Sequence, residues 1–386
     1  MTQKRGYGPV PNDTRYGDWF TRLIRRKLPK ARKKTWSACE LTLSFRYCMG
    51  TNDESCTVSV LREYGVKRLI AVVVLTAAFS AHADVEWAYQ VLDEALLPQS
   101  DLEIDLQAPR TVPGSSLQRT QEEIDDHWNP PDWFPDSHYA PVPEVVARGA
   151  GPNVRACAAC HGFTGAGHPE SSHLAGLTVG YITRQLADFR SAATRSPSGS
   201  NAMRIDRSWM NRFEPTDEQI RQAAEWYAGM EVIDWIDEVI ETDTVPQTYI
   251  GDGRMRHIHP DGGTEPINGR IIEVPQDREL ATARHPNSGF TVYAPTGSVA
   301  RGEELVMTGG DGRTLECLTC HGQDLKGFGD TPRLAGISPL YVVRQLNDFR
   351  TGDRDGTLGS LMTLTVASMT DEDIVAIAAY LATLDP

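Results

Sequence analysis

The sequence Cys157-Ala158-Ala159-Cys160-His161 returns 160 residues later as Cys317-Leu318-Thr319-Cys320-His321. The Cys-x-x-Cys-His spacing is the signature of covalent c-type haem attachment. Two cysteines one helical turn apart can form thioethers with the two haem vinyl groups, and the adjacent histidine then lies under the iron. A single copy would also be consistent with half of a zinc site or with a thioredoxin-like redox pair.

The repetition extends well beyond the motif. Residues 157–190 and 317–350 align without a gap, and 15 of 34 positions are identical. The identities outside the motif include a Leu-Ala-Gly triplet, a tyrosine and the runs Arg-Gln-Leu and Asp-Phe-Arg. A zinc ribbon has no reason to repeat all of these positions, whereas a duplicated haem domain does. We therefore expect two covalent haem c groups. Their attachment residues are Cys157, Cys160, His161, Cys317, Cys320 and His321.

Charge divides the chain near residue 83. Residues 1–83 carry 15 Lys and Arg against 6 Asp and Glu, whereas residues 84–386 carry 23 against 46. The division coincides with an apolar run, Leu69 to Ala81, that leads into an Ala-x-Ala pattern, so we expect a secretory signal peptide at residues 66–83. An uncleaved membrane anchor is the alternative, but the run is shorter than the roughly 20 residues that span a bilayer.

The signal peptide would lie unusually far from the start of the chain. Residues 1–65 precede it and contain a basic cluster and three scattered cysteines. Because a secretory signal normally opens a protein, we interpret this segment as lying upstream of the true start, which would be Met49 or Val66. A genuine cytoplasmic basic extension is the alternative.

Composition and periodicity divide the rest of the chain further. Residues 84–142 are rich in proline and aromatic residues, which prevents long helices and central strands. We expect an extended arm whose Trp and Phe side chains pack on the first haem domain. The haem domains, residues 143–235 and 297–386, should each have a short helix before the motif, an amphipathic helix after it and a capped closing helix.

Residues 236–296 form a connector between the haem domains. Short β-prone runs at residues 239–242 and 271–274, with glycine-rich turns between them, predict a small hairpin. The connector histidines, His257, His259 and His285, are expected to be solvated loop residues rather than metal ligands, because no cysteine or acidic partner lies at ligand spacing.

A haem iron has a sixth ligand or an open position, and this difference separates an electron carrier from an enzyme. Met362 lies 41 residues after its motif histidine, and Met203 lies 42 residues after its own. Met210 and Met369 form a second matched pair. Met369 occupies the apolar position before the closing helix and is expected in the core. Met210 remains an alternative to Met203. The predicted iron ligands are His161 with Met203 and His321 with Met362.

The order Cys-x-x-Cys-His, Leu-Ala-Gly, Tyr-x-x-Arg-Gln-Leu-x-x-Phe-Arg, a distant methionine and a closing Thr-Asp-Glu helix resembles class I cytochrome c in its two-domain, dihaem form. Only residues 143–235 and 297–386 carry the resemblance. It implies an all-α fold of two helical haem domains with His/Met iron, which pass single electrons between partners in the periplasm. It also implies haem attachment outside the cytoplasm, and without residues 1–83 the four motif cysteines are the only cysteines left.

The resemblance extends to residues around the haem. It implies that the Pro332 carbonyl accepts a hydrogen bond from Nδ1 of the proximal histidine, and Ser172 is the matching residue of the first domain. Arg354 resembles an arginine that pairs with a haem propionate. For Arg184 and Arg344, an exposed helix position and a propionate contact both remain open.

The negative charge of residues 84–386 indicates docking to basic partner surfaces and would repel nucleic acid. We expect an electron carrier rather than an enzyme. Two other classes remain open. The chain could be the cytochrome subunit of a periplasmic dehydrogenase complex, with the arm as an interface and possible contact with the membrane. Alternatively, one haem could act as a peroxidase with Met203 absent from the iron.

Overall fold

The computed structural model describes residues 85–89, 96–98, 101, 104–191, 209–251 and 254–386. The predictions for residues 1–65, for the signal peptide at 66–83 and for Met203 lie outside these residues. Within the described ranges, no helix combines the length and the apolar character that crossing a bilayer requires.

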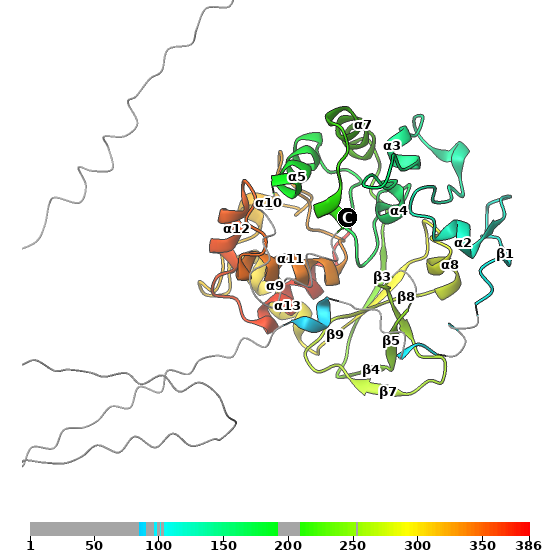
Figure 1. The fold of residues 1–386 in the computed structure, drawn as a ribbon. Coiled ribbons are helices and arrows are strands. Elements are labelled where there is room, and N and C mark those ends of the chain that lie inside the picture. The colour runs from blue at the N-terminus through cyan, green and yellow to red at the C-terminus, as the bar shows by residue number, and fades with distance from the viewer. Residues whose placement is uncertain (1–84, 90–95, 99–100, 102–103, 192–208, 252–253) are drawn as a thin grey trace, which may run out of the picture. The chain divides into compact units, whose positions relative to one another are not determined.

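The first haem domain is a set of helices around the first motif (Figure 1). Its elements are α3 (Glu144–Ala147), α4 (Ala158–His161), α5 (Val179–Ser191), the 3-10 helix η5 (Trp209–Arg212) and α7 (Asp217–Ala228). The predicted capping box begins α7, because the Thr216 side chain accepts a hydrogen bond from the Gln219 amide and the Gln219 side chain accepts one from the Thr216 amide. The predicted apolar face of α7 is buried, with Tyr227 fully inaccessible.

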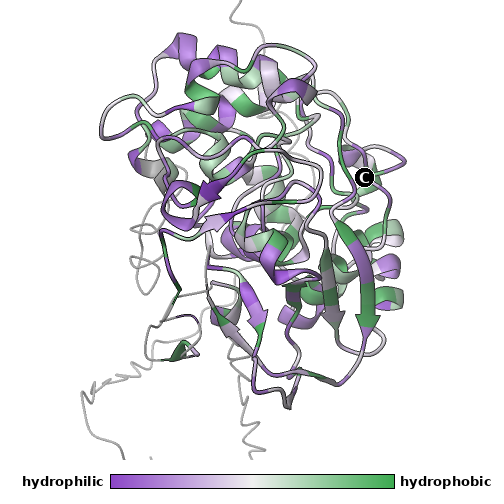
Figure 2. Ribbon diagram, turned by 90° about the vertical axis from the view of Figure 1, so that its right-hand side faces the viewer, coloured by the Kyte–Doolittle hydropathy of each residue, from purple (hydrophilic) through white to green (hydrophobic). Residues whose placement is uncertain are grey.

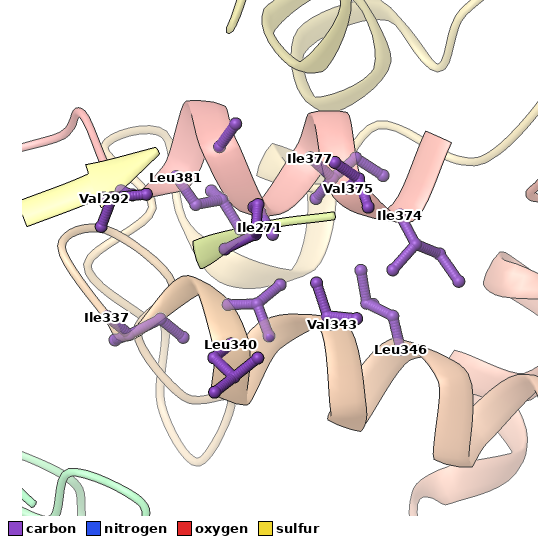
Figure 3. Packing of buried hydrophobic residues seen from close by; sticks show 14 of the residues in the cluster. Ile271, Val292, Ile337, Leu340, Val343, Leu346, Ile374, Val375, Ile377 and Leu381 are labelled. Atoms are coloured by element: carbon purple, nitrogen blue, oxygen red, sulfur yellow. The ribbon is translucent and has the colours of Figure 1, made fainter. Parts of the chain in front are cut away.

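The second haem domain repeats this plan, with a longer helix before its motif. Its elements are α9 (Ser298–Thr308), α10 (Leu318–His321), α11 (Pro339–Thr351), α12 (Gly359–Val366) and α13 (Asp371–Leu381). Figure 3 shows the side chains of Ile374, Ile377 and Leu381 on α13 pointing toward those of Leu340, Val343 and Leu346 on α11. Helix α9 crosses α13 closely, since a Cβ atom at Gly302 would lie 2.0 Å from the Ala376 carbonyl oxygen.

The connector contains several small sheets, where the sequence predicted β-prone runs and one small hairpin. A three-stranded sheet has the order β3-β9-β8, with β3 parallel and β8 antiparallel to β9. Two antiparallel pairs, β4 with β7 and β5 with β6, and the short helix α8 complete it. The bounds are β3 (Ile236–Glu241), β4 (Thr244–Pro246), β5 (Thr248–Ile250), β6 (Arg256–Ile258), β7 (Thr264–Pro266), β8 (Ile272–Pro275), α8 (Arg278–Thr282) and β9 (Phe290–Ala294).

The two β-prone runs of the connector are strands β3 and β8, as predicted, but they do not pair with each other. Both pair with β9, whose residues alternate between buried and partly buried positions. The prediction missed this strand because a parallel partner some fifty residues away leaves no turn signal between the two strands. In Figure 2 the helices carry both polar and apolar residues, as helices with only one face in a core do.

Two of the connector histidines are buried, so the prediction that they are solvated is wrong for both. His257 on β6 is 1% exposed and lies 5.8 Å from the Tyr249 ring centroid. His285 is 9% exposed and packs edge-on against Phe134 of the arm at 5.4 Å. Loop composition does not reveal burial of this kind, because aromatic groups from other segments cover both rings.

The arm has only short elements, as its proline content predicts. They are the 3-10 helix η1 (Glu86–Ala88), β1 (Pro109–Arg110), β2 (Arg119–Thr120), α2 (Gln121–Ile124) and the 3-10 helix η3 (Pro135–Ser137). Trp128 lies on the first haem domain, where its Nε1 donates to the Gly151 carbonyl. However, Trp133 donates to the Ala283 carbonyl of the connector, and Trp87 packs against the core that contains the second domain. The prediction that the arm packs on the first domain is therefore only partly correct.

Candidate haem-binding site

A cavity of about 1000 Å³ lies between the two helical domains. Both motif histidines, His161 and His321, line it, together with Cys157, Cys160 and Cys320. Apolar side chains of α5 and α11, such as Phe189 and Phe349, form much of the remaining wall. The fold thus brings the two motifs, 160 residues apart in the sequence, to one continuous space.

Each motif histidine is held by a backbone carbonyl. Nδ1 of His161 lies 2.8 Å from the Ser172 oxygen, and Nδ1 of His321 lies 2.8 Å from the Pro332 oxygen. Because Nδ1–H donates to the carbonyl, Nε2 keeps the lone pair that binds a metal. Burial lowers the pKa of both imidazoles, which favours this neutral form. The predicted carbonyl contact is confirmed in both domains, and serine serves as well as proline.

The motif cysteines sit on the same helical turn as their histidine. The His161 amide donates to the Cys157 carbonyl at 3.0 Å, and the His321 amide donates to the Cys317 carbonyl at 2.9 Å. None of the four motif cysteines forms a disulfide. Before haem attaches, burial would raise the pKa of Cys157 to about 12 and that of Cys317 to about 11, so both would be neutral thiols.

The methionines divide between cavity and core. Met362 on α12 lines the cavity, whereas Met369 is 2% exposed within the core, as predicted. In the first domain Met210 on η5 lines the cavity. The chemistry of this donor set fits haem c, because the site offers thiols for both vinyl groups, a neutral imidazole held by a carbonyl, and a thioether on the cavity wall.

Two equivalent arginines join the domains. Arg184 Nη1 on α5 lies 3.1 Å from Asp330 Oδ2, and Arg344 Nη1 on α11 lies 3.0 Å from Glu170 Oε1. Arg184 matches Arg344 and Glu170 matches Asp330 at the offset of 160. The same ion pair therefore forms twice in opposite directions, as across the two-fold axis of a dimer. Sequence reasoning missed these pairs, although the oppositely charged residues at equal offsets were a usable signal.

Arg354 lies where the two domains meet. Its guanidinium donates to Oε1 of Gln345 and to Oε1 of Gln185, both at 2.7 Å, and to the Tyr181 hydroxyl at 3.2 Å. Gln185 and Gln345 are equivalent residues of the two repeats. Arg354 also lines the cavity, so it links the domains at the wall of the site.

Positive charge surrounds the first motif. Arg155, Arg254 and Arg284 all lower the pKa of the Cys160 thiol, although burial raises it more strongly. Arg284 also donates a hydrogen bond to the Ala159 carbonyl inside the motif. In the second motif, Leu315 stands where the first has Arg155. The two sites therefore share their ligand geometry but differ in their surrounding charge.

The cytochrome c family model matches residues 146–230 and 299–385. The thiosulfate dehydrogenase electron acceptor of Stutzerimonas stutzeri is 28% identical over 241 residues, 61% of this chain and 81% of that protein. Cytochrome c-554(548) of Halomonas halodenitrificans is 36% identical over 85 residues, 22% of this chain and 93% of that protein. A solved cytochrome c4 of Acidithiobacillus ferrooxidans has a TM-score of 0.39 and 19% identity, and the match covers 59% of this chain and 98% of that one.

The two matches to the family model fall on the two segments that carry the Cys-x-x-Cys-His motifs. The resemblance seen in the sequence is thereby confirmed, and so is the expectation of two covalent haem c groups. The helical haem domains are accompanied by the small sheets of the connector, so the all-α description holds for the haem domains alone. The chain is an electron-carrying protein that belongs to the cytochrome c family and contains its domain twice.

Proposed function

We propose that this protein is a periplasmic dihaem carrier whose irons are ligated by His161 with Met203 and by His321 with Met362. One observation carries the proposal. Both carbonyl-held histidines line a single cavity, and Met362 lies on the wall of the same cavity. When bound, haem supplies a one-electron Fe(III)/Fe(II) couple.

The chain's own residues fix how that couple behaves. The Ser172 and Pro332 carbonyls orient the imidazoles, so the ligand geometry stays the same in both oxidation states. A thioether as the sixth ligand raises the reduction potential and leaves no position open for a substrate. Apolar side chains of α5 and α11, such as Phe189 and Phe349, line the cavity and would limit the contact of bound haem with water. These features favour a carrier over an enzyme.

We further propose that the protein is exported and docks with basic redox partners. The signal sequence at residues 66–83 supports export, and the charge balance of residues 84–386 supports docking to positive surfaces. Association rates with such partners should fall as ionic strength rises, because salt screens the attraction.

A second candidate role is that of a cytochrome subunit in a dehydrogenase complex. The relative named thiosulfate dehydrogenase electron acceptor favours it. In that case the arm, which touches both haem domains and the connector, would provide part of the interface. Purification of the native protein at low salt tests this role: co-elution with a larger oxidoreductase subunit supports it, and a monomeric carrier contradicts it.

Methionine variants test the ligand assignment. We expect Met362→Ala and Met203→Ala each to convert one of the two haems to a high-spin form, because the iron loses its thioether. Met369→Ala is the matched control for the second domain; it should keep both haems low-spin and lose about 2–5 kcal/mol of stability by leaving a core cavity. Optical and magnetic spectra measure the spin states.

Met210→Ala is the matched control for the first domain. We expect both haems to stay low-spin in this variant. A high-spin haem in Met210→Ala but not in Met203→Ala would transfer the ligand role to Met210. Rapid turnover of peroxide by the unmodified protein would contradict the carrier role itself.

A further inference from the structure

The first motif is covered by segments outside the haem domains. The Ala156 amide donates to the His127 carbonyl of the arm at 3.0 Å, and the Gly149 amide donates to the Trp128 carbonyl at 2.7 Å. From the connector, Arg284 donates to the Ala159 carbonyl. Ala156, with 2% of its surface exposed, and Ala159, with 3%, are therefore buried. The arm and the connector therefore cover the first motif at these alanines.

The second motif is open at the same positions. Glu316 and Thr319, which match Ala156 and Ala159, are both exposed, and neither lines the cavity. The residue types follow this difference, because the two buried alanines of the first motif are replaced by polar residues in the second. The residues beside the cysteines of the second motif thus face solvent, whereas the equivalent residues of the first motif are buried.

Exposed apolar side chains surround the open motif. Leu315 is 65% exposed, Phe328 is 76% exposed and Leu364 is 75% exposed. None of the three lines the cavity, so haem does not cover them. Exposed apolar groups that cluster on a soluble protein usually mark an interaction site.

The three side chains belong to segments that meet at the motif. The Thr314 hydroxyl donates to the Thr365 carbonyl at 3.0 Å, which places Leu315 beside the end of α12 and therefore near Leu364. The Gly327 amide donates to the His321 carbonyl at 2.9 Å, which returns the loop with Phe328 to the motif. We call Leu315, Thr319, Phe328 and Leu364 the port surface.

Negatively charged side chains lie around the port surface. Asp311, Glu316 and Asp324 are exposed. The two cations nearby are already engaged: Arg313 lies 3.4 Å from Asp373, and Lys326 donates to the Pro386 carbonyl. A second copy of this chain would present the same negative fringe and be repelled. The complementary partner has an apolar centre ringed by Lys and Arg, the usual arrangement of a docking interface.

We infer that the protein exchanges electrons with its partners at the second domain, through the port surface, and that this partner is a redox protein with an apolar, lysine- or arginine-ringed contact site. The first haem then exchanges electrons with the outside by way of the second. The inference rests on the proposed carrier function, and it adds which of the two domains docks and what the partner's surface is made of.

The test uses the complete haem-loaded protein, reduced and then mixed with either of two oxidants in a stopped-flow instrument. Tris(1,10-phenanthroline)cobalt(III) is a cation with an aromatic surface and stands for the partner, whereas hexacyanoferrate(III) is an anion. We expect Glu316→Lys to slow oxidation by the cobalt complex at least about threefold and to speed oxidation by hexacyanoferrate, because it reverses a charge of the fringe. Phe328→Ser should slow only the cobalt reaction, by about threefold.

The matched control is Leu106→Ser, which removes an apolar side chain of 51% exposure from the arm and should change neither rate. The inference would be overturned if neither Glu316→Lys nor Phe328→Ser changed the oxidation rates. It would also be overturned if Leu106→Ser slowed the cobalt reaction as much as Phe328→Ser does. Haem content and a redox titration of each variant separate the two claims. If each variant takes up two electrons reversibly but its oxidation rates do not change, only the docking inference is contradicted. If the protein takes up no electrons reversibly, the carrier function is contradicted as well.

Discussion

The two haem domains hold their histidines identically and differ in almost everything around them. Nδ1 of the motif histidine lies 2.8 Å from a carbonyl oxygen in both. The arm, the connector and three arginines surround the first motif, whereas the second lies open beside exposed leucine and phenylalanine side chains. The comparison teaches that the repeated segment sets the ligand geometry, while the segments outside the repeat set access and local charge.

The largest effect should come from removing the thiols of one motif. Cys317→Ser with Cys320→Ser should leave one covalent haem instead of two, and Cys157→Ser with Cys160→Ser should do the same. Each domain has a buried core cluster of its own, so the domain without substitutions should still fold and keep its haem. Intact mass measures the haem count. Loss of both haems from either double variant would contradict the independence of the halves.

The reciprocal ion pairs should differ in strength. The Arg344 side chain is 9% exposed and Glu170 is 18% exposed, whereas Arg184 and Asp330 are 22% and 46% exposed. Removing one member of a buried pair costs about 3–5 kcal/mol, and removing one member of an exposed pair costs about 1 kcal/mol or less. We therefore expect Arg344→Met to lower the free energy of unfolding more than Arg184→Met, as denaturant titration will show. Equal losses of unfolding free energy would mean that the two ion pairs contribute equally to stability, as they share the same geometry.

The surrounding charge should separate the two reduction potentials. A positive group near a haem stabilises the reduced form, so the first haem, with Arg155, Arg254 and Arg284 around its motif, should have the higher potential. Arg284→Gln should lower it by roughly 40 mV, since one charge at an effective dielectric of about 20 contributes about 1 kcal/mol. Arg119→Gln on the arm is the control. If Arg284→Gln lowered the reduction potential of the second haem instead of the first, Arg284 would act on the second haem and the proposed difference would be contradicted.

The last comparison concerns the caps of the equivalent helices α5 and α11. Thr178 before α5 donates to Asp330, which is partly exposed, whereas Ser338 before α11 donates at 2.7 Å to Glu273, which is 1% exposed. Burial raises the pKa of Glu273 from 4.5 to about 7. Between these values the folded carboxyl keeps a proton that the unfolded chain has lost. The free energy of unfolding should therefore fall as pH rises through this window, by at most about 1.4 kcal/mol per pH unit.

Glu273→Gln should remove that part of the pH dependence, because an amide does not titrate. Denaturant unfolding at about pH 5 and about pH 8 measures the difference. Glu279→Gln, at a carboxylate whose side chain is 80% exposed, is the control and should leave the pH profile unchanged. An unaltered profile in Glu273→Gln would show that this carboxyl is ionised in the fold.

Local patterns in the sequence predicted the parts of the structure that depend on local chemistry. Spacing predicted helices α5 and α11, and the caps at Thr216 and Thr370 are both present. Contacts between distant segments were not predictable in this way. The pairing of β3 with β9, the packing of Trp133 on Ala283 and the packing of His285 on Phe134 each depend on a partner far along the chain. The ion pairs of Arg184 and Arg344 could be predicted only by comparing charged residues at equivalent positions of the two repeats.

The central claim is that one chain carries two covalently bound, six-coordinate haems that each exchange one electron. A coulometric redox titration of the purified mature protein, followed by optical and magnetic spectra, tests it most directly. The account predicts two electrons per chain in two reversible one-electron steps, with both haems low-spin throughout. One electron per chain, or a haem that stays high-spin and reacts with peroxide, would contradict it.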